Sequence, residues 1–168
     1  NWTWNVVWFS DPVFLGHYPK EGLEQFKEYL PEITDADMEL IHQPLDFMGQ
    51  NIYNGYYVRA GENGEPEFVA REPGFPKTGT DWPVTPKAFY YGIKFLTERY
   101  PLPLYITENG MGCHDNVAPD GRVHDNDRIT FLDSYIGAMQ QAMQEGADVR
   151  GYFLWTFLDN FEWSDGYK

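Results

Sequence analysis

The feature that most constrains the fold of this chain is an alternation of short apolar segments with longer amphipathic ones. The short segments end in polar or aromatic residues, as strands do at an active face, and the longer ones have helical spacing. Strands separated by helices imply parallel pairing, so that all strands end at one face of the sheet. We therefore predict an α/β fold with strands at 46–53, 102–106 and 149–154.

Two helices are predicted between these strands. Thr85-Pro86 has the preferred order for a helix start. The second helix covers 126–145 and closes at Gly146. The predicted apolar face of the first helix comprises Phe89, Ile93 and Leu96, and that of the second comprises Ile129, Leu132, Ile136, Met139 and Met143.

Other local signals predict two further helices and a hairpin. A helical pattern at 20–30 stops at Pro31, and a second short helix to about Ile41 begins at Thr34, with Asp37 as a capping-box partner. Two apolar stretches, 56–58 and 68–70, flank a polar Glu-Asn-Gly-Glu segment. This arrangement predicts a β-hairpin inserted between the first strand and its helix.

A carboxylate follows the most apolar of the three strands. The run at 102–106 leads into Thr107-Glu108-Asn109-Gly110, which places Glu108 at the carboxyl end of a buried strand. Asn and Gly also favour turns, so a polar turn is the alternative interpretation of this motif. In α/β barrels the carboxyl ends of strands carry the chemistry, which makes Glu108 a candidate catalytic group.

Composition excludes several function classes. The chain of 168 residues has a formal net charge of -14 and lacks clustered Lys and Arg, so we expect no nucleic-acid partner. No apolar run reaches the roughly 18 residues of a membrane-spanning helix, so we expect no membrane partner. Its four histidines lack metal-ligand spacing, and we expect no metal and no cofactor. The single cysteine, Cys113, excludes an intramolecular disulfide and is compatible with a reducing, cytoplasmic location.

The motifs at the three strand ends resemble those of glycoside hydrolase family 1, the retaining β-glucosidases. They are Asp-Phe-Met-Gly-Gln-Asn-Ile-Tyr at 46–53, Ile-Thr-Glu-Asn-Gly at 106–110 and Trp-Thr-Phe-Leu-Asp-Asn-Phe-Glu-Trp at 155–163. The opening motif from Trp8 to Pro19 is also similar to that family. The resemblance implies that 1–168 is the C-terminal portion of one (β/α)8 TIM-barrel catalytic domain, about strands six to eight, with its N-terminal half and final helix absent.

The resemblance also assigns roles to individual residues. Glu108 matches the family's nucleophile, and Tyr53 matches the tyrosine that orients it, although a core tyrosine is the ordinary alternative. The residues that match substrate-binding positions are Glu162, Trp163, Trp155, Asn51 and Trp82, the last two on looser motifs. Glu162 would favour unphosphorylated sugars because a carboxylate repels phosphate, and its alternative interpretation is a surface-loop glutamate.

The function implied is hydrolysis of terminal non-reducing β-D-glucosyl residues, with β-glucosides or cello-oligosaccharides as substrates. The family's acid/base glutamate lies in an Asn-Glu-Pro segment, and no such segment occurs in this sequence. We therefore expect the chain by itself to be inactive and to need the missing N-terminal half of the barrel as a partner. A non-catalytic carbohydrate-binding fragment is the alternative, and the preference among gluco, galacto and fuco sugars stays open.

Overall fold

The computed structural model describes residues 6–163 and 165–167, and the chain divides into two compact units. The first comprises Asn1–Phe47 and the second Met48–Lys168. All three strands of the predicted parallel sheet and all predicted site residues belong to the second unit.

The first unit contains three short helices. They are α1 (Trp8–Leu15), α2 (Lys20–Phe26) and α3 (Asp35–Ile41). The capping box predicted at α3 is present: the Asp37 N–H donates to Thr34 Oγ1 at 3.2 Å, and the Thr34 N–H donates to Asp37 Oδ2 at 2.8 Å. The helix predicted at 20–30 ends earlier, because the Tyr29 N–H donates to the Phe26 carbonyl three residues back and tightens the chain into a turn.

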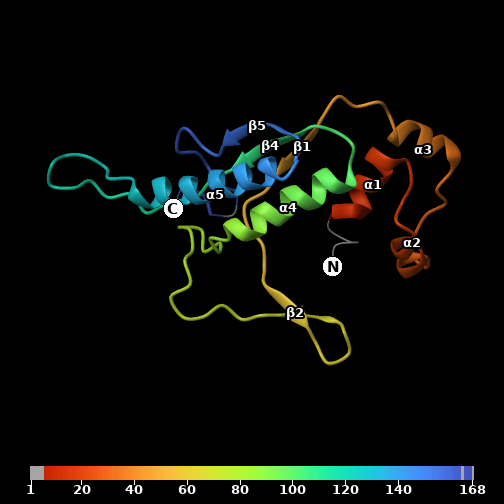
Figure 1. Cartoon of the computed structure of the whole chain (residues 1–168), viewed down its shortest axis with the longest axis horizontal. Coiled ribbons are helices and arrows are strands. Elements are labelled where there is room, and N and C mark those ends of the chain that lie inside the picture. The colour runs from red at the N-terminus through yellow and green to blue at the C-terminus, as the bar shows by residue number, and fades with distance from the viewer. Residues whose placement is uncertain (1–5, 164, 168) are drawn as a thin grey trace. The chain divides into compact units, whose positions relative to one another are not determined.

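A three-stranded parallel sheet forms the centre of the second unit (Figure 1). Its strands are β1 (Met48–Asn51), β4 (Leu104–Asn109) and β5 (Val149–Leu154), in the order β1-β4-β5. This confirms the predicted parallel strands, and the register places Asn51 opposite Glu108 and Asn109 opposite Leu154. Within the described residues the strands form an open sheet and not a closed barrel.

The predicted hairpin is also present. Strands β2 (Val58–Ala60) and β3 (Pro66–Phe68) follow β1 and precede α4 in the chain. They pair antiparallel and form a separate two-stranded sheet. The hairpin strands are fully exposed, and Figure 1 shows β2 away from the parallel sheet.

The helices α4 (Pro86–Arg99) and α5 (Asn126–Gln144) pack against each other, and α4 also contacts β4. The buried face of α4 is the predicted one, Phe89, Ile93 and Leu96. The face predicted for α5 is wrong, because its buried residues are Phe131, Tyr135 and Ala142. Of the predicted residues, Leu132 and Met139 are half-buried, and Ile129, Ile136 and Met143 are exposed. Tyr135 is buried in place of these aliphatic residues because its ring buries a larger apolar surface and its hydroxyl has hydrogen-bond partners inside the core.

In the part of the chain that is described, no helix combines the length and the apolar character that crossing a bilayer requires.

Candidate active site

Glu108 and Tyr53 meet where β1 and β4 end. Glu108 is the last residue but one of β4, and its carbonyl accepts from the Ile52 N–H at 3.0 Å, which extends the β1–β4 ladder past β1. Tyr53 follows directly, and its hydroxyl donates to Glu108 Oε2 at 2.6 Å. The contact expected between these two side chains is therefore present, and its length is that of a charge-assisted hydrogen bond.

The environment keeps the Tyr53 phenol protonated. Burial, the hydrogen bond to Glu108 and the negative charges of Glu108 and Glu162 raise the pKa of Tyr53 far above its usual value. A phenol that stays neutral remains a donor, so Tyr53 can hold one oxygen of the Glu108 carboxylate in a fixed direction.

Trp155 and Glu162 approach this pair from the end of β5. The Trp155 N–H donates to the Asn109 carbonyl at 2.9 Å, and its peptide bond to Thr156 is cis. Its indole Nε1 points to Glu162 Oε2 at 3.5 Å. Glu162 is held by a tight turn in which its N–H and carbonyl pair with Gly166 at 2.8 and 2.7 Å. The structure thus brings an indole and a carboxylate together beside the Tyr53–Glu108 pair.

Trp82 also joins the site, although its motif match was loose. Its ring centroid lies 5.1 Å from that of Tyr53 in an edge-to-face arrangement. The loop that carries it is closed by the Trp82 N–H donating to Thr78 Oγ1 at 3.2 Å. The Gly79 N–H of this loop donates to the Gly112 carbonyl at 2.6 Å, which ties the loop to the segment after β4.

The side chains of the remaining two predicted residues, Asn51 and Trp163, do not contact Glu108 or Tyr53 through any described hydrogen bond or ring contact. Asn51 is exposed, and its Oδ1 accepts from Thr107 Oγ1 at 2.7 Å, so it contacts the neighbour of Glu108 and not Glu108 itself. The Trp163 side chain is 87% exposed. In the described structure Trp163 is therefore not packed against the other site residues.

Sequence reasoning missed Asn109 and Tyr152, which join the ends of all three strands. Asn109 is completely buried; its Nδ2 donates to the Ile52 carbonyl at 2.8 Å, and its Oδ1 accepts from Tyr152 Oη at 2.7 Å. The Asn-Gly motif is compatible with a polar turn, and the partners of Asn109 are 43 and 57 residues distant, beyond the reach of local patterns.

Gly110 is required at its position by a close approach of the backbone. A Cβ added there would overlap the carbonyl oxygen of Trp155, which belongs to the loop after β5. A glycine at this point lets the chain leaving β4 pass directly beside the Trp155 backbone.

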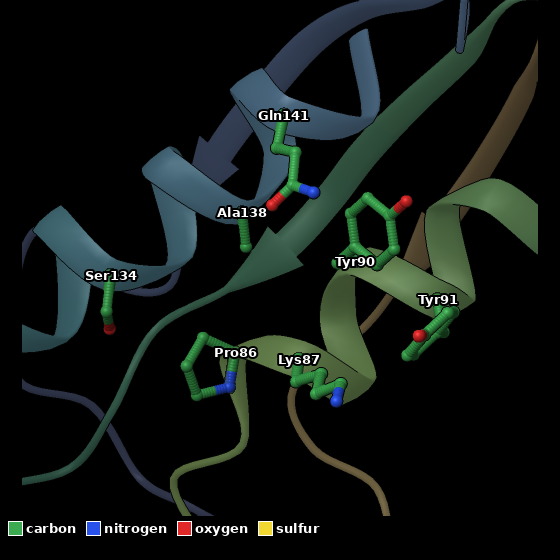
Figure 2. Close-up of a pocket in the computed structure, with 7 residues that line it drawn as sticks. All are labelled: Pro86, Lys87, Tyr90, Tyr91, Ser134, Ala138 and Gln141. Atoms are coloured by element: carbon green, nitrogen blue, oxygen red, sulfur yellow. The ribbon is translucent and has the colours of Figure 1, made fainter. Parts of the chain in front are cut away.

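The second unit also contains a cavity outside this site. This cavity, of about 390 Å³, lies between α4 and α5 (Figure 2), and it contains none of the predicted site residues. The polar ends of two of its lining residues are engaged, because Tyr90 Oη and Gln141 Nε2 both donate to the Glu145 carboxylate. Among the residues described, no group of three His, Cys, Asp or Glu side chains could hold a metal ion.

The arrangement suits a neutral, hydroxyl-rich ligand. An aromatic ring can stack on the apolar C–H face of a sugar, while carboxylates accept hydrogen bonds from its hydroxyls. Tyr53 holds one oxygen of the Glu108 carboxylate, so Glu108 has a fixed orientation at this strand end. The site lies at the carboxyl ends of parallel strands, where α/β enzymes carry their active sites.

Comparisons with known proteins identify the family. The sequence profile described as Glycosyl hydrolase family 1 matches residues 1–168, and the chain belongs to this family. It is 42% identical over 165 residues to "Beta-glucosidase A" of Thermotoga maritima, covering 98% of this chain and 37% of that protein. It is 39% identical over 182 residues to the "Bifunctional beta-D-glucosidase/beta-D-fucosidase" of Bifidobacterium breve, covering 95% of this chain and 39% of that protein.

Solved structures agree with this assignment. The β-glucosidase from Thermotoga maritima in complex with castanospermine matches with a TM-score of 0.83 and 42% identity, over 96% of this chain and 36% of that one. The same enzyme with deoxynojirimycin gives the same TM-score and identity. These relatives are TIM barrels, and the chain spans only somewhat more than a third of their length.

Proposed function

We propose that this chain carries the nucleophile half of a retaining β-glucosidase, with Glu108 as the nucleophile. The observation that carries the proposal is the 2.6 Å hydrogen bond from Tyr53 to Glu108 at the shared end of β1 and β4. Glu108 would attack the anomeric carbon, forming a glycosyl ester as the bond to the leaving oxygen breaks; water would then hydrolyse the ester.

The leaving oxygen needs a proton from a second carboxyl group, about 5–5.5 Å from the nucleophile in retaining enzymes. The family motif that supplies this group, Asn-Glu-Pro, does not occur in the chain. We therefore assign the acid/base step to another part of the barrel, for which β1, β4 and β5 would be strands six to eight. General-acid help of about 100- to 10,000-fold would depend on that part.

The substrate class follows from the residues around Glu108. Trp155 would stack on the sugar ring, and Glu162, which its indole Nε1 approaches at 3.5 Å, would accept hydrogen bonds from sugar hydroxyls, with Trp163 beside it. A carboxylate at this position disfavours phosphorylated sugars. Terminal β-D-glucosyl residues are the proposed substrate, with fucosyl residues a second possibility in view of the name of the Bifidobacterium breve relative.

The experiment that tests this proposal is covalent labelling of Glu108. The full-length protein, meaning this chain together with the rest of the proposed barrel, is incubated with a 2-deoxy-2-fluoro β-glucoside. This reagent bears an activated leaving group, which departs without general-acid help. Intact mass should increase by one sugar, and peptide mapping should place the sugar on Glu108. Glu108→Gln should abolish labelling, whereas Glu65→Gln, which changes an exposed hairpin carboxylate, should leave labelling unchanged.

A label on a different residue, or undiminished labelling of Glu108→Gln, would exclude Glu108 as the nucleophile. Reversible quenching of tryptophan fluorescence by glucosides without any mass increase would instead support the non-catalytic carbohydrate-binding function. The specific observation that favours this second candidate is the exposure of Trp155 and Trp163, 40% and 87% in this chain.

A further inference from the structure

The segment that carries Tyr53 has no regular secondary structure, yet its backbone is held at three successive points. The Ile52 carbonyl accepts from Asn109 Nδ2 at 2.8 Å, and the Tyr53 carbonyl accepts from Tyr135 Oη at 3.0 Å. The Gly55 N–H donates to Thr85 Oγ1 at 3.0 Å. Three anchors over four residues fix a stretch that would otherwise behave as a loop.

Two of these anchors come from the helical layer and are linked to each other. Tyr135 in the middle of α5 donates to the Tyr53 carbonyl and accepts from the Thr85 N–H at 2.8 Å, just before α4 begins. Its side chain is fully buried, and its ring is held between the Phe131 ring, stacked at 4.0 Å, and the Phe89 ring at 5.3 Å. A phenol enclosed in this way can neither rotate freely nor be replaced by water, so both of its hydrogen bonds depend on this one side chain.

The same residue, Tyr53, receives this anchor on its carbonyl and presents its phenol to Glu108 at 2.6 Å. A displacement of its backbone would therefore move the phenol away from the carboxylate oxygen that it orients. Misplacement of a catalytic group by about 1 Å can cost on the order of 100-fold in rate.

We infer that Tyr135, together with Thr85, is a positioning residue for the nucleophile: it acts through Tyr53 and does not touch the substrate. The inference rests on the proposed function of Glu108. It assigns a catalytic consequence to a helix residue that would otherwise be classed as part of the core.

A double-mutant cycle in the full-length protein tests this inference. Tyr135→Phe keeps the ring and removes only the hydroxyl. With an aryl β-glucoside we expect kcat to fall by about tenfold or more, while KM changes by less than about threefold. The same substitution in a Tyr53→Phe background should have almost no further effect on kcat, because the link through which it acts is already absent.

The matched control is Tyr90→Phe. Tyr90 is also a tyrosine that connects α4 and α5, since its hydroxyl donates to Glu145, but neither residue belongs to the segment that carries Tyr53. The kcat of the Tyr90→Phe variant should stay at the wild-type value. Equal losses in both variants, or a Tyr135→Phe loss that persists in full without the Tyr53 hydroxyl, would overturn the inference in favour of a general packing role.

Thr85 provides a second route if Tyr135→Phe does not fold. Thr85→Val removes the acceptor for the Gly55 N–H at nearly constant volume and should lower kcat, whereas Thr85→Ser should retain it; equal kcat in these two variants would overturn the inference. Labelling of the Glu108→Gln variant, measured in the same series, distinguishes failure of the proposed function from failure of the positioning role. If it still labels, the proposed function fails; if it does not and Tyr135→Phe matches Tyr90→Phe, only the positioning role fails.

Discussion

At the scale of single residues, the hydrogen bond between Tyr53 and Glu108 is the contact that most directly supports the proposed chemistry. The donor comes from the segment after β1 and the acceptor from β4, 55 residues later. Neither residue is unusual by itself, since buried tyrosines and strand-end carboxylates are common. Their contact gives the carboxylate a preferred orientation, and the motifs predicted this contact through the family resemblance.

The first prediction concerns this hydrogen bond. Tyr53→Phe removes the donor to Glu108 and should lower kcat on the order of 10- to 100-fold, because hydrogen bonds to charged groups are about twice as strong as neutral ones. Steady-state kinetics of the full-length protein, with Tyr90→Phe as the control for loss of a phenol elsewhere, would measure it. An unchanged kcat would show that the carboxylate does not need this donor.

The second prediction concerns alkaline pH. Burial, with a smaller effect of Tyr135, raises the pKa of Tyr152 to about 12. Folding therefore favours the neutral phenol, and this stabilisation is complete below the pKa of an unfolded tyrosine, about 10, and is lost as pH rises toward 12. Urea unfolding at pH 8 and pH 11 should show a smaller decrease in stability for Tyr152→Phe than for the wild type. An equal decrease would contradict the assignment.

At the scale of elements, the helices and strands follow from local signals, but the junctions between them depend on close backbone contacts. The clearest case is the contact between the segments that follow β4 and β5, because Gly110 leaves space for the carbonyl of Trp155. The exposed Gly137 in α5 is different, since an added Cβ would meet no atom within 4 Å.

These two glycines give a paired prediction. Gly110→Ala should separate β4 from the Trp155 loop and destabilise the protein by more than about 2 kcal/mol, with loss of Glu108 labelling. Gly137→Ala should stabilise it by up to about 1 kcal/mol, because alanine favours helix and no clash opposes it. Denaturant unfolding of both variants measures these changes. Similar effects of the two substitutions on stability would contradict the conclusion that Gly110 is needed to leave space for the Trp155 carbonyl.

At the scale of the whole molecule, the described residues expose several large apolar side chains. The segment after β5 is the most exposed, with Phe157 at 91%, Leu158 at 70%, Phe161 at 61% and Trp163 at 87%. The order β1-β4-β5 also leaves an unpaired edge on β1 and on β5 within the described residues. Such surface and edges favour association with other chains.

The 168-residue chain expressed alone should therefore self-associate and bind a hydrophobic dye. Co-expression with a polypeptide that supplies the first five strands of a family barrel should reduce dye binding and give a one-to-one complex that labels at Glu108. Light scattering and intact mass would measure this. A stable 19.6 kDa monomer that binds no dye would contradict the partial-barrel interpretation.

The sequence by itself determined most of the elements and the position of Glu108 at the end of a strand, because periodicity, caps and strand-end motifs are encoded within a few residues. The capping box at Thr34 and the buried face of α4 were predicted for this reason, whereas the face of α5 was not, because burial of Tyr135 depends on partners 50 and 82 residues away. Only the tertiary structure decided that Asn109 joins the strand ends and that Trp82 lies against Tyr53. Those contacts join segments distant in sequence, and their energy depends on packing that no local pattern contains.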